Sequence, residues 1–142
     1  MLRRIGPIVL VALCVATLWY LRDPAWVEHQ TTGLREWQVA PDGRRFRWST
    51  GHASFFVPAD ASSIRVPVAT RFDTVLDAPM TVTFAIDDRR AGGAVLSDAA
   101  WTTVVLTLPP RGHRSFRRVD VRTSVTRADN YGVMIGDVDV IR

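Results

Sequence analysis

The longest apolar stretch of the chain lies close to its N-terminus, where the 17 residues from Ile5 to Leu21 include no charged side chain. A helix of this length would extend about 26 Å, which is close to the roughly 30 Å hydrocarbon core of a bilayer. Two arginines precede the stretch, and Trp19 and Tyr20 lie at its far end. This arrangement is typical of a span with a cytoplasmic N-terminus. The pattern therefore predicts a membrane anchor over residues 1–22.

A cleaved secretory signal is the alternative, because it shares the positive start and the apolar middle. Such a signal ends in small residues, and the nearest arrangement of that kind, Cys14–Ala16, would leave the bulky residues 18–21 on the mature protein. Leu13 is also too large for the small residue that precedes an acylated cysteine in a lipoprotein. The pattern favours an uncleaved single span in the cytoplasmic membrane, with the rest of the chain periplasmic or extracellular.

From residue 44 onward, short segments alternate apolar and polar positions with a period of two, as half-buried β-strands do. The expected strands cover residues 45–48, 54–57, 64–68, 81–86, 94–96, 101–108, 118–125 and 133–141. Turns are expected at 50–51 and over 87–93 because glycine and aspartate gather there. Pro67 indicates an edge strand or a bulge, since proline has no amide proton for the ladder.

No stretch after residue 22 carries a sustained helical stripe of apolar residues, so the outer part of the chain is predicted to be all-β. Short strands that each have one apolar face need a second layer to cover those faces. We therefore predict a two-sheet, jelly-roll-like β-sandwich over residues 44–142, preceded by a single N-terminal transmembrane helix. Residues 23–43 contain turn signals and little periodicity, and we expect them to form a stalk.

The formal charge of +4 comes mainly from the anchor. Without Arg3, Arg4 and Arg22, the remaining 15 arginines face 14 acidic residues, so the outer domain is nearly neutral. A nucleic-acid partner is therefore not expected. The single cysteine, Cys14, lies inside the apolar run, which excludes an intrachain disulfide. Arginine without any lysine is typical of a GC-rich bacterial genome, and a domain held by packing alone fits a bacterial envelope protein.

The sequence lacks the arrangements of residues that are typical of catalytic sites. The three histidines, His29, His52 and His113, have neither a second histidine nor a carboxylate at the spacing of a metal site. The chain also contains no Gly-x-Ser-x-Gly elbow and no phosphate-binding glycine loop. The aspartates at 87–88 and at 137 and 139 could offer oxygen ligands to calcium, but turn chemistry and a solvated strand face explain them better. We predict no catalytic residue, no metal and no cofactor.

Exposed aromatic rings and a basic cluster are the candidate binding groups. A β-sandwich commonly holds a sugar by stacking it on such rings, which makes Trp101, Tyr131 and Trp37 candidates. Arg114 and Arg117 belong to a cluster of basic residues that could bind acidic glycans, lipid phosphates or an acidic partner. A solvated loop and strand face would explain the same cluster.

Three segments resemble the galactose-binding-like, carbohydrate-module type of β-sandwich. Val82–Asp88 resembles a strand ending in an acidic turn, Trp101–Leu108 a strand opened by tryptophan, and Gly112-His113 the loop before the next strand. Pro41–Trp48 also resembles the entry to β-domains appended to bacterial membrane glycosyltransferases. The resemblance implies a jelly-roll sandwich in a glycan-related setting.

These patterns together give a leading hypothesis and two alternatives. The first is a membrane-anchored, extracytoplasmic, non-catalytic β-sandwich that binds an envelope glycan or assists envelope glycan assembly. The second is a structural or interaction subunit that docks onto a membrane protein partner. An enzyme is the third, and would require a role for His113.

Overall fold

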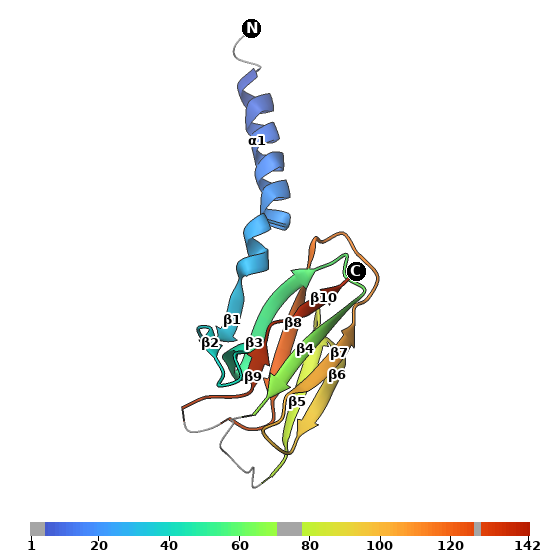
Figure 1. The fold of residues 1–142 in the computed structure, drawn as a ribbon. Coiled ribbons are helices and arrows are strands. Elements are labelled where there is room, and N and C mark those ends of the chain that lie inside the picture. The colour runs from blue at the N-terminus through green and yellow to red at the C-terminus, as the bar shows by residue number, and fades with distance from the viewer. Residues whose placement is uncertain (1–4, 71–77, 127–128) are drawn as a thin grey trace.

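The computed structural model describes residues 5–70, 78–126 and 129–142. A helix, α1 (Ile5–Arg22), stands apart from a body of β-strands (Figure 1). Within the described residues, Gly6–His29 is the one stretch that is long and apolar enough to cross a membrane, and a signal sequence would meet the same criteria. The expected orientation of the span depends on Arg3 and Arg4, which lie outside the described residues.

A short 3-10 helix, η2 (Ala25–His29), connects α1 to ten antiparallel strands. The strands are β1 (Thr31–Leu34), β2 (Gln38–Val39), β3 (Arg45–Pro58), β4 (Ser63–Ala69), β5 (Met80–Ile86), β6 (Arg89–Leu96), β7 (Thr102–Thr107), β8 (Phe116–Thr123), β9 (Met134–Gly136) and β10 (Asp139–Ile141).

The long strand β3 organises the strands into two sheets. Its second part, from His52 to Pro58, pairs with β8, which continues to β5 and β6; with β1 these strands form the β8 sheet. Its first part, from Phe46 to Trp48, pairs with β9, which continues to β4 and β7; with β2 and β10 these strands form the β4 sheet. Because β3 belongs to both, the two sheets form one connected network (Figure 1).

The core lies between the inner faces of the two sheets. Val82 and Phe84 on β5 and Val66 and Leu106 on the β4 sheet have no exposed surface, and all four belong to one buried cluster. This cluster spans both layers and confirms the predicted sandwich. The alternation expected on β5 and β7 is confirmed. The strand expected over residues 118–125 ends earlier, at Thr123, and Val125 beyond it is 56% exposed, so the expected end of this strand is wrong.

The turn expected at residues 50–51 is absent, because β3 continues through it. On one side of β3, the backbone N–H of Ser49 donates to the carbonyl oxygen of Val133 at 2.8 Å. On the other side, β1 approaches β3 closely at Gly33, which has φ +65°. Any other residue at this position would place its Cβ atom 2.2 Å from the carbonyl oxygen of His52, so the close approach requires glycine. Long-range pairing therefore outweighs the local turn preference of this segment.

The turn after β5 is shorter than expected. Asp87 and Asp88 form a two-residue hairpin loop with φ of +47° and +67°, which are signs typical of a type I′ turn. Aspartate tolerates these angles better than most residues, which explains why the reversal is so compact. β6 then begins at Arg89, so the expectation of a turn as far as Gly93 is wrong.

Pro67 lies in the interior strand β4 and not at an edge. Along this strand the pairing changes from Val68 opposite Ile135 to Arg65 opposite Asp139, which places one extra residue on the side of β9 and β10. The bulge expected as the alternative to an edge strand is therefore present, close to the residue that cannot donate to the ladder. It also divides the predicted C-terminal strand into β9 and β10.

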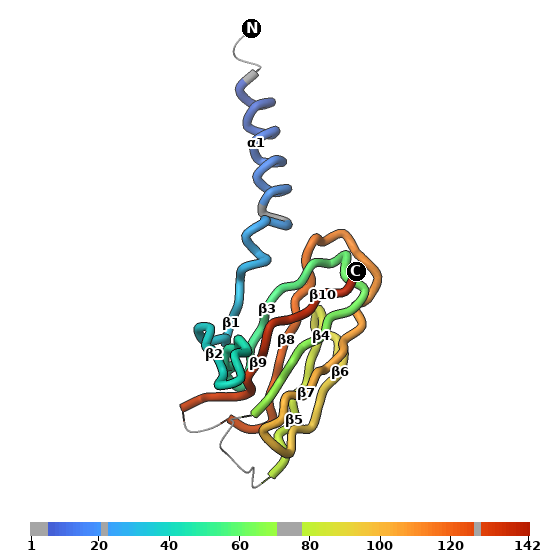
Figure 2. The backbone as a smooth tube through the Cα atoms, in the orientation of Figure 1, coloured from blue at the N-terminus to red at the C-terminus, as the bar shows by residue number. Residues whose placement is uncertain are grey.

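The segment between α1 and β3 is partly sheet. β1 and β2 lie within residues 23–43, where a stalk is expected, and both pair with β3. Figure 2 shows the chain passing from η2 along the side of β3 before it turns back into this strand. The boundary at residue 43 stays a prediction, and the structure adds that much of this segment is paired with the domain.

We expect Val82→Ala to lower the free energy of unfolding by about 2 kcal/mol, because it removes two methyl groups from a fully buried site. Val95→Ala is the matched control, since Val95 lies on the neighbouring strand and is 65% exposed. Denaturant unfolding of the full chain in mild detergent, monitored by the near-UV circular dichroism of its tryptophans, measures the free energy of unfolding of both variants. Equal losses for the two variants would contradict the placement of the core.

Candidate functional site

Four aromatic rings lie in contact on the outer face of the β4 sheet, and we call them the aromatic row. The ring of Phe46 lies 6.4 Å from that of Trp101 and 6.1 Å from that of Trp48, between ring centroids. The ring of Tyr131 continues the row at 5.2 Å from Trp48. All three contacts are edge-to-face, which is a favoured geometry for aromatic pairs. The two tryptophans and the tyrosine are half-buried, whereas Phe46 is buried beneath them.

The row exists because the outer face of the β4 sheet carries a second apolar cluster. Trp48 pairs with Met134 and Met134 with Ala69, so these three side chains lie on one face of the sheet. Ala40, from the segment between β2 and β3, completes a small buried cluster with them. Aromatic surface that would otherwise face water is thus partly covered and held in place.

Tyr131 is positioned by the loop that enters β9. The buried hydroxyl oxygen of Ser49 accepts a hydrogen bond from the backbone N–H of Val133 at 2.9 Å, and the Ser49 carbonyl oxygen accepts one from Gly132 at 2.7 Å. Gly132 has no room for a side chain, since a Cβ atom there would lie 2.6 Å from the carbonyl oxygen of Thr50. The loop is therefore fixed to β3 directly beside the ring.

Guanidinium groups lie over both ends of the aromatic row. The Arg35 guanidinium lies 4.1 Å from the centre of the Tyr131 ring and donates a hydrogen bond to the carbonyl oxygen of Asp129 at 2.8 Å. The Arg44 guanidinium lies 5.9 Å from the centre of the Trp101 ring. Rings of this kind can stack on the C–H face of a sugar, and guanidinium groups can donate to its hydroxyl or carboxylate oxygens.

Trp37, the third aromatic candidate, lies outside the row. The guanidinium groups of Arg45 and Arg47 lie 4.7 and 4.6 Å from the centre of its ring. Burial lowers the pKa of Arg47, and the nearby Asp137 carboxylate opposes that shift by raising it. Trp37 thus lines a different part of the surface, beside a cavity of about 310 Å³ that also includes residues of η2.

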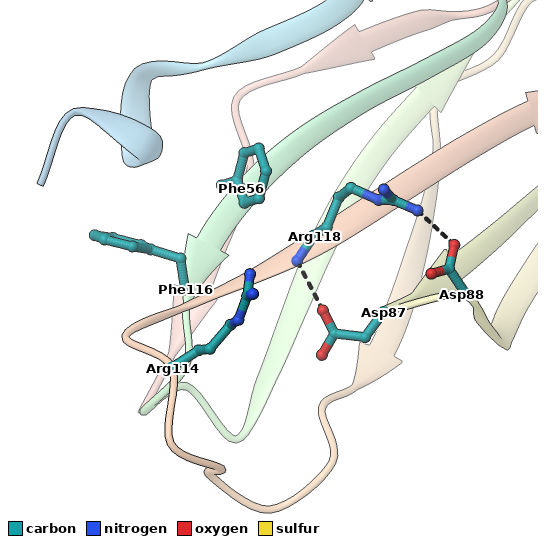
Figure 3. A pocket seen from close by; sticks show the side chains of 6 residues that line it. All are labelled: Phe56, Asp87, Asp88, Arg114, Phe116 and Arg118. Carbon is teal, nitrogen blue, oxygen red and sulfur yellow. Dashed lines mark hydrogen bonds and ion pairs between the residues drawn. The ribbon is translucent and has the colours of Figure 1, made fainter. Parts of the chain in front are cut away.

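The two basic candidates lie near the opposite end of the strands from the row. Arg117 is largely buried and holds a carboxylate oxygen of Asp87 at 2.7 Å, so it acts as a structural link between β8 and the β5 turn. Arg114 is exposed and lines a cavity of about 430 Å³ with Phe56, Phe116 and the two turn aspartates (Figure 3). The structure therefore does not bring the five candidates together.

A polar network on the outer face of the β8 sheet includes none of the five residues predicted from the sequence. The Asp120 side chain is almost fully buried, and its two carboxylate oxygens lie 3.2 Å from His52 Nε2 and 2.9 Å from Arg118 Nε. The hydrogen bond to Asp120 raises the pKa of Arg118. Alternation along β8 turns Asp120 to the face opposite Val119 and Val121, but the pairing that brings His52 close to it depends on strand order and could not be read from the spacing of residues.

Metal-ligating side chains do not gather in the part of the chain that the structure describes. Within these residues, no group of three or more histidine, cysteine, aspartate or glutamate side chains could hold a metal ion. The turn aspartates considered as calcium ligands are engaged with Arg117 and Arg118.

Solved structures with a similar fold include a domain described as sugar-binding. The C-terminal domain of EclA, described as a sugar-binding protein, matches with a TM-score of 0.51 at 14% identity, over 74% of this chain and 89% of that one. The fold is that of a carbohydrate-module β-sandwich. This agrees with the resemblance in the sequence, and at this level of identity the match shows the fold alone.

Two further structures match at TM-scores below 0.5. The carbohydrate-binding module CBM36, in complex with calcium and xylotriose, gives 0.48 at 11% identity, over 78% of this chain and 92% of that one. A family two carbohydrate esterase from Clostridium thermocellum gives 0.49 at 10% identity, over 80% of this chain. The chain spans about a third of that esterase, 33% of its length. No protein-family model matches the chain, and no curated protein matches it either.

We expect Ser49→Ala to loosen the loop that carries Tyr131, because it leaves the buried amide of Val133 without its acceptor. The free energy of unfolding should fall by about 1 to 3 kcal/mol, and exchange of the Val133 amide should accelerate. Hydrogen–deuterium exchange checks this, with Ser54→Ala on the same strand as the matched control. Unchanged exchange at Val133 would show that the hydroxyl does not hold the loop.

Proposed function

We propose that this protein is a membrane-anchored, extracytoplasmic, non-catalytic carbohydrate-binding domain, and that its glycan binds on the aromatic row. The observation that carries the proposal is the gathering of three half-buried rings, Trp48, Trp101 and Tyr131, on one outer face of a carbohydrate-module fold. Half-buried rings are both fixed in position and open to a ligand, as a stacking surface requires.

The position of the row relative to α1 supports display away from a membrane. β3 runs toward the α1 end of the domain, so its first residues, which carry Phe46 and Trp48, lie at the far end (Figure 1). Trp101 precedes β7, whose pairing with β4 places it at this far end too. An anchor formed by α1 would hold the row at the end of the domain that lies farther from the bilayer.

The chemistry of the row favours a glycan with acidic or hydroxyl-rich groups. Arg35 and Arg44 lie over the two ends of the row, and arginine donates in a planar fork that matches a carboxylate. A bacterial envelope polysaccharide would offer both apolar sugar faces and such acidic groups. Binding of this kind also suits a subunit that assists envelope glycan assembly.

We expect Trp101→Ala and Tyr131→Ala each to weaken glycan binding about tenfold or more, because each removes one stacking face. Trp37→Ala is the matched control, since Trp37 is an exposed tryptophan that lies outside the row. Glycan arrays and pull-downs with envelope polysaccharides, using the full chain in detergent, measure the affinities.

The same experiment separates this proposal from a docking role. Absence of binding to every envelope polysaccharide by the folded protein would overturn the glycan proposal. A membrane protein crosslinked in stoichiometric amount, with yield unchanged by Trp101→Ala and Tyr131→Ala, would then favour the structural subunit. Equal loss of glycan affinity in Trp37→Ala would place the ligand elsewhere than on the row.

A further inference from the structure

The loop between β7 and β8, residues 108–115, is joined to the end of α1. The backbone N–H of Ser115 donates a hydrogen bond to the carboxylate of Asp23, the residue that directly follows the helix. Figure 1 shows this loop at the same end of the sandwich as α1 and the C-terminus. If α1 spans a bilayer, the loop lies at the level of the lipid headgroups.

The exposed side chains of this loop are basic. Arg111, His113 and Arg114 are all exposed, and neither arginine forms an ion pair with another residue in the described parts of the chain. The carboxylates of the neighbouring β5 turn are already engaged, Asp87 with Arg117 and Asp88 with Arg118. The two loop arginines therefore present positive charge that no described side chain neutralises.

The loop is also held in a defined shape. The Arg117 guanidinium donates to the carbonyl oxygen of Pro110, and the Ser115 carbonyl oxygen accepts a hydrogen bond from Ala59 at 2.8 Å. Both ends of the basic segment are thus fastened to the sandwich. Because the segment does not need to be ordered on binding, its arginines can meet a ligand with little loss of conformational entropy.

The cavity beside Arg114 combines charged groups with aromatic rings: it is lined by two arginines, two phenylalanines and the two turn aspartates, which are already ion-paired. Figure 3 shows the Arg114 guanidinium extending between the ring of Phe116 and the β5 turn, with the ring of Phe56 nearby. The cavity has a volume of about 430 Å³. A guanidinium matches the oxygens of a phosphate, and the two rings offer apolar surface to the carbons next to it.

We propose that Arg111 and Arg114 bind the phosphate groups of anionic phospholipids in the same membrane that α1 enters. This inference rests on the proposed anchor and is independent of the glycan site. Since the anchor keeps the loop at the surface, even a weak contact is strengthened by a high effective concentration. Two attachments, the helix and the loop, would fix the orientation of the sandwich relative to the membrane and keep the aromatic row away from the lipid.

The test uses the full chain in nanodiscs of phosphatidylcholine alone and of an equimolar mixture with phosphatidylglycerol. We expect amides of residues 111–116 to exchange about fivefold more slowly in the anionic nanodiscs, and high salt to remove the difference. Arg111→Gln combined with Arg114→Gln should abolish it. Arg45→Gln combined with Arg122→Gln removes the same charge from elsewhere in the domain and should preserve it.

The outcomes separate this proposal from the one on which it rests. Equal exchange in the two kinds of nanodisc, with the protein incorporated in both, would overturn the lipid contact and leave the anchor intact. Failure of the protein to enter nanodiscs would overturn the anchor and the lipid contact together. Protection by inorganic phosphate in phosphatidylcholine nanodiscs, without any effect of phosphatidylglycerol, would assign the cavity to free phosphate and overturn the lipid assignment.

Discussion

The structure depends on the crossing of β3 from one sheet to the other at Ser49. Before this point, Phe46 and Trp48 cover the outer face of the β4 sheet, and after it Phe55 enters the core between the sheets. Ser49 is fully buried, and its backbone and hydroxyl are all hydrogen-bonded to the loop before β9. A buried amide without an acceptor is costly, so this set of bonds keeps the strand and the loop together. The sandwich and the aromatic row therefore rest on the same contact.

The two ends of the sandwich have different chemistry, although the domain as a whole is nearly neutral. The far end gathers aromatic rings with a guanidinium group over each terminal ring. The end near α1 presents arginines, while its aspartates are engaged in ion pairs such as Asp87 with Arg117. Separation of this kind suits a domain that must contact two different surfaces at once. Net charge alone does not reveal it, because a net charge does not say where the charged and aromatic side chains lie.

Sequence periodicity predicts the sandwich well because one face of each strand is buried and the alternation is strict. Val82 and Phe84 on β5 and Val104 and Leu106 on β7 follow this rule. It fails where tertiary pairing outweighs local preference, as at the turn expected in the middle of β3. The site was predictable only in part, since Trp101 and Tyr131 could be named as exposed rings. Their meeting through Phe46 and Trp48 depends on the order of strands, which spacing along the chain does not contain.

The pairing of β3 also determines when the domain can fold. Its partners β8 and β9 begin at Phe116 and Met134, so β3 has no neighbour on that side until most of the chain has been synthesised. No disulfide can hold an early intermediate together, because the chain has a single cysteine. Contacts this distant in sequence form slowly, and unpaired strands are prone to aggregate. An N-terminal anchor would insert first, so that each chain would complete its sandwich while tethered in the membrane and separated from other unfinished copies.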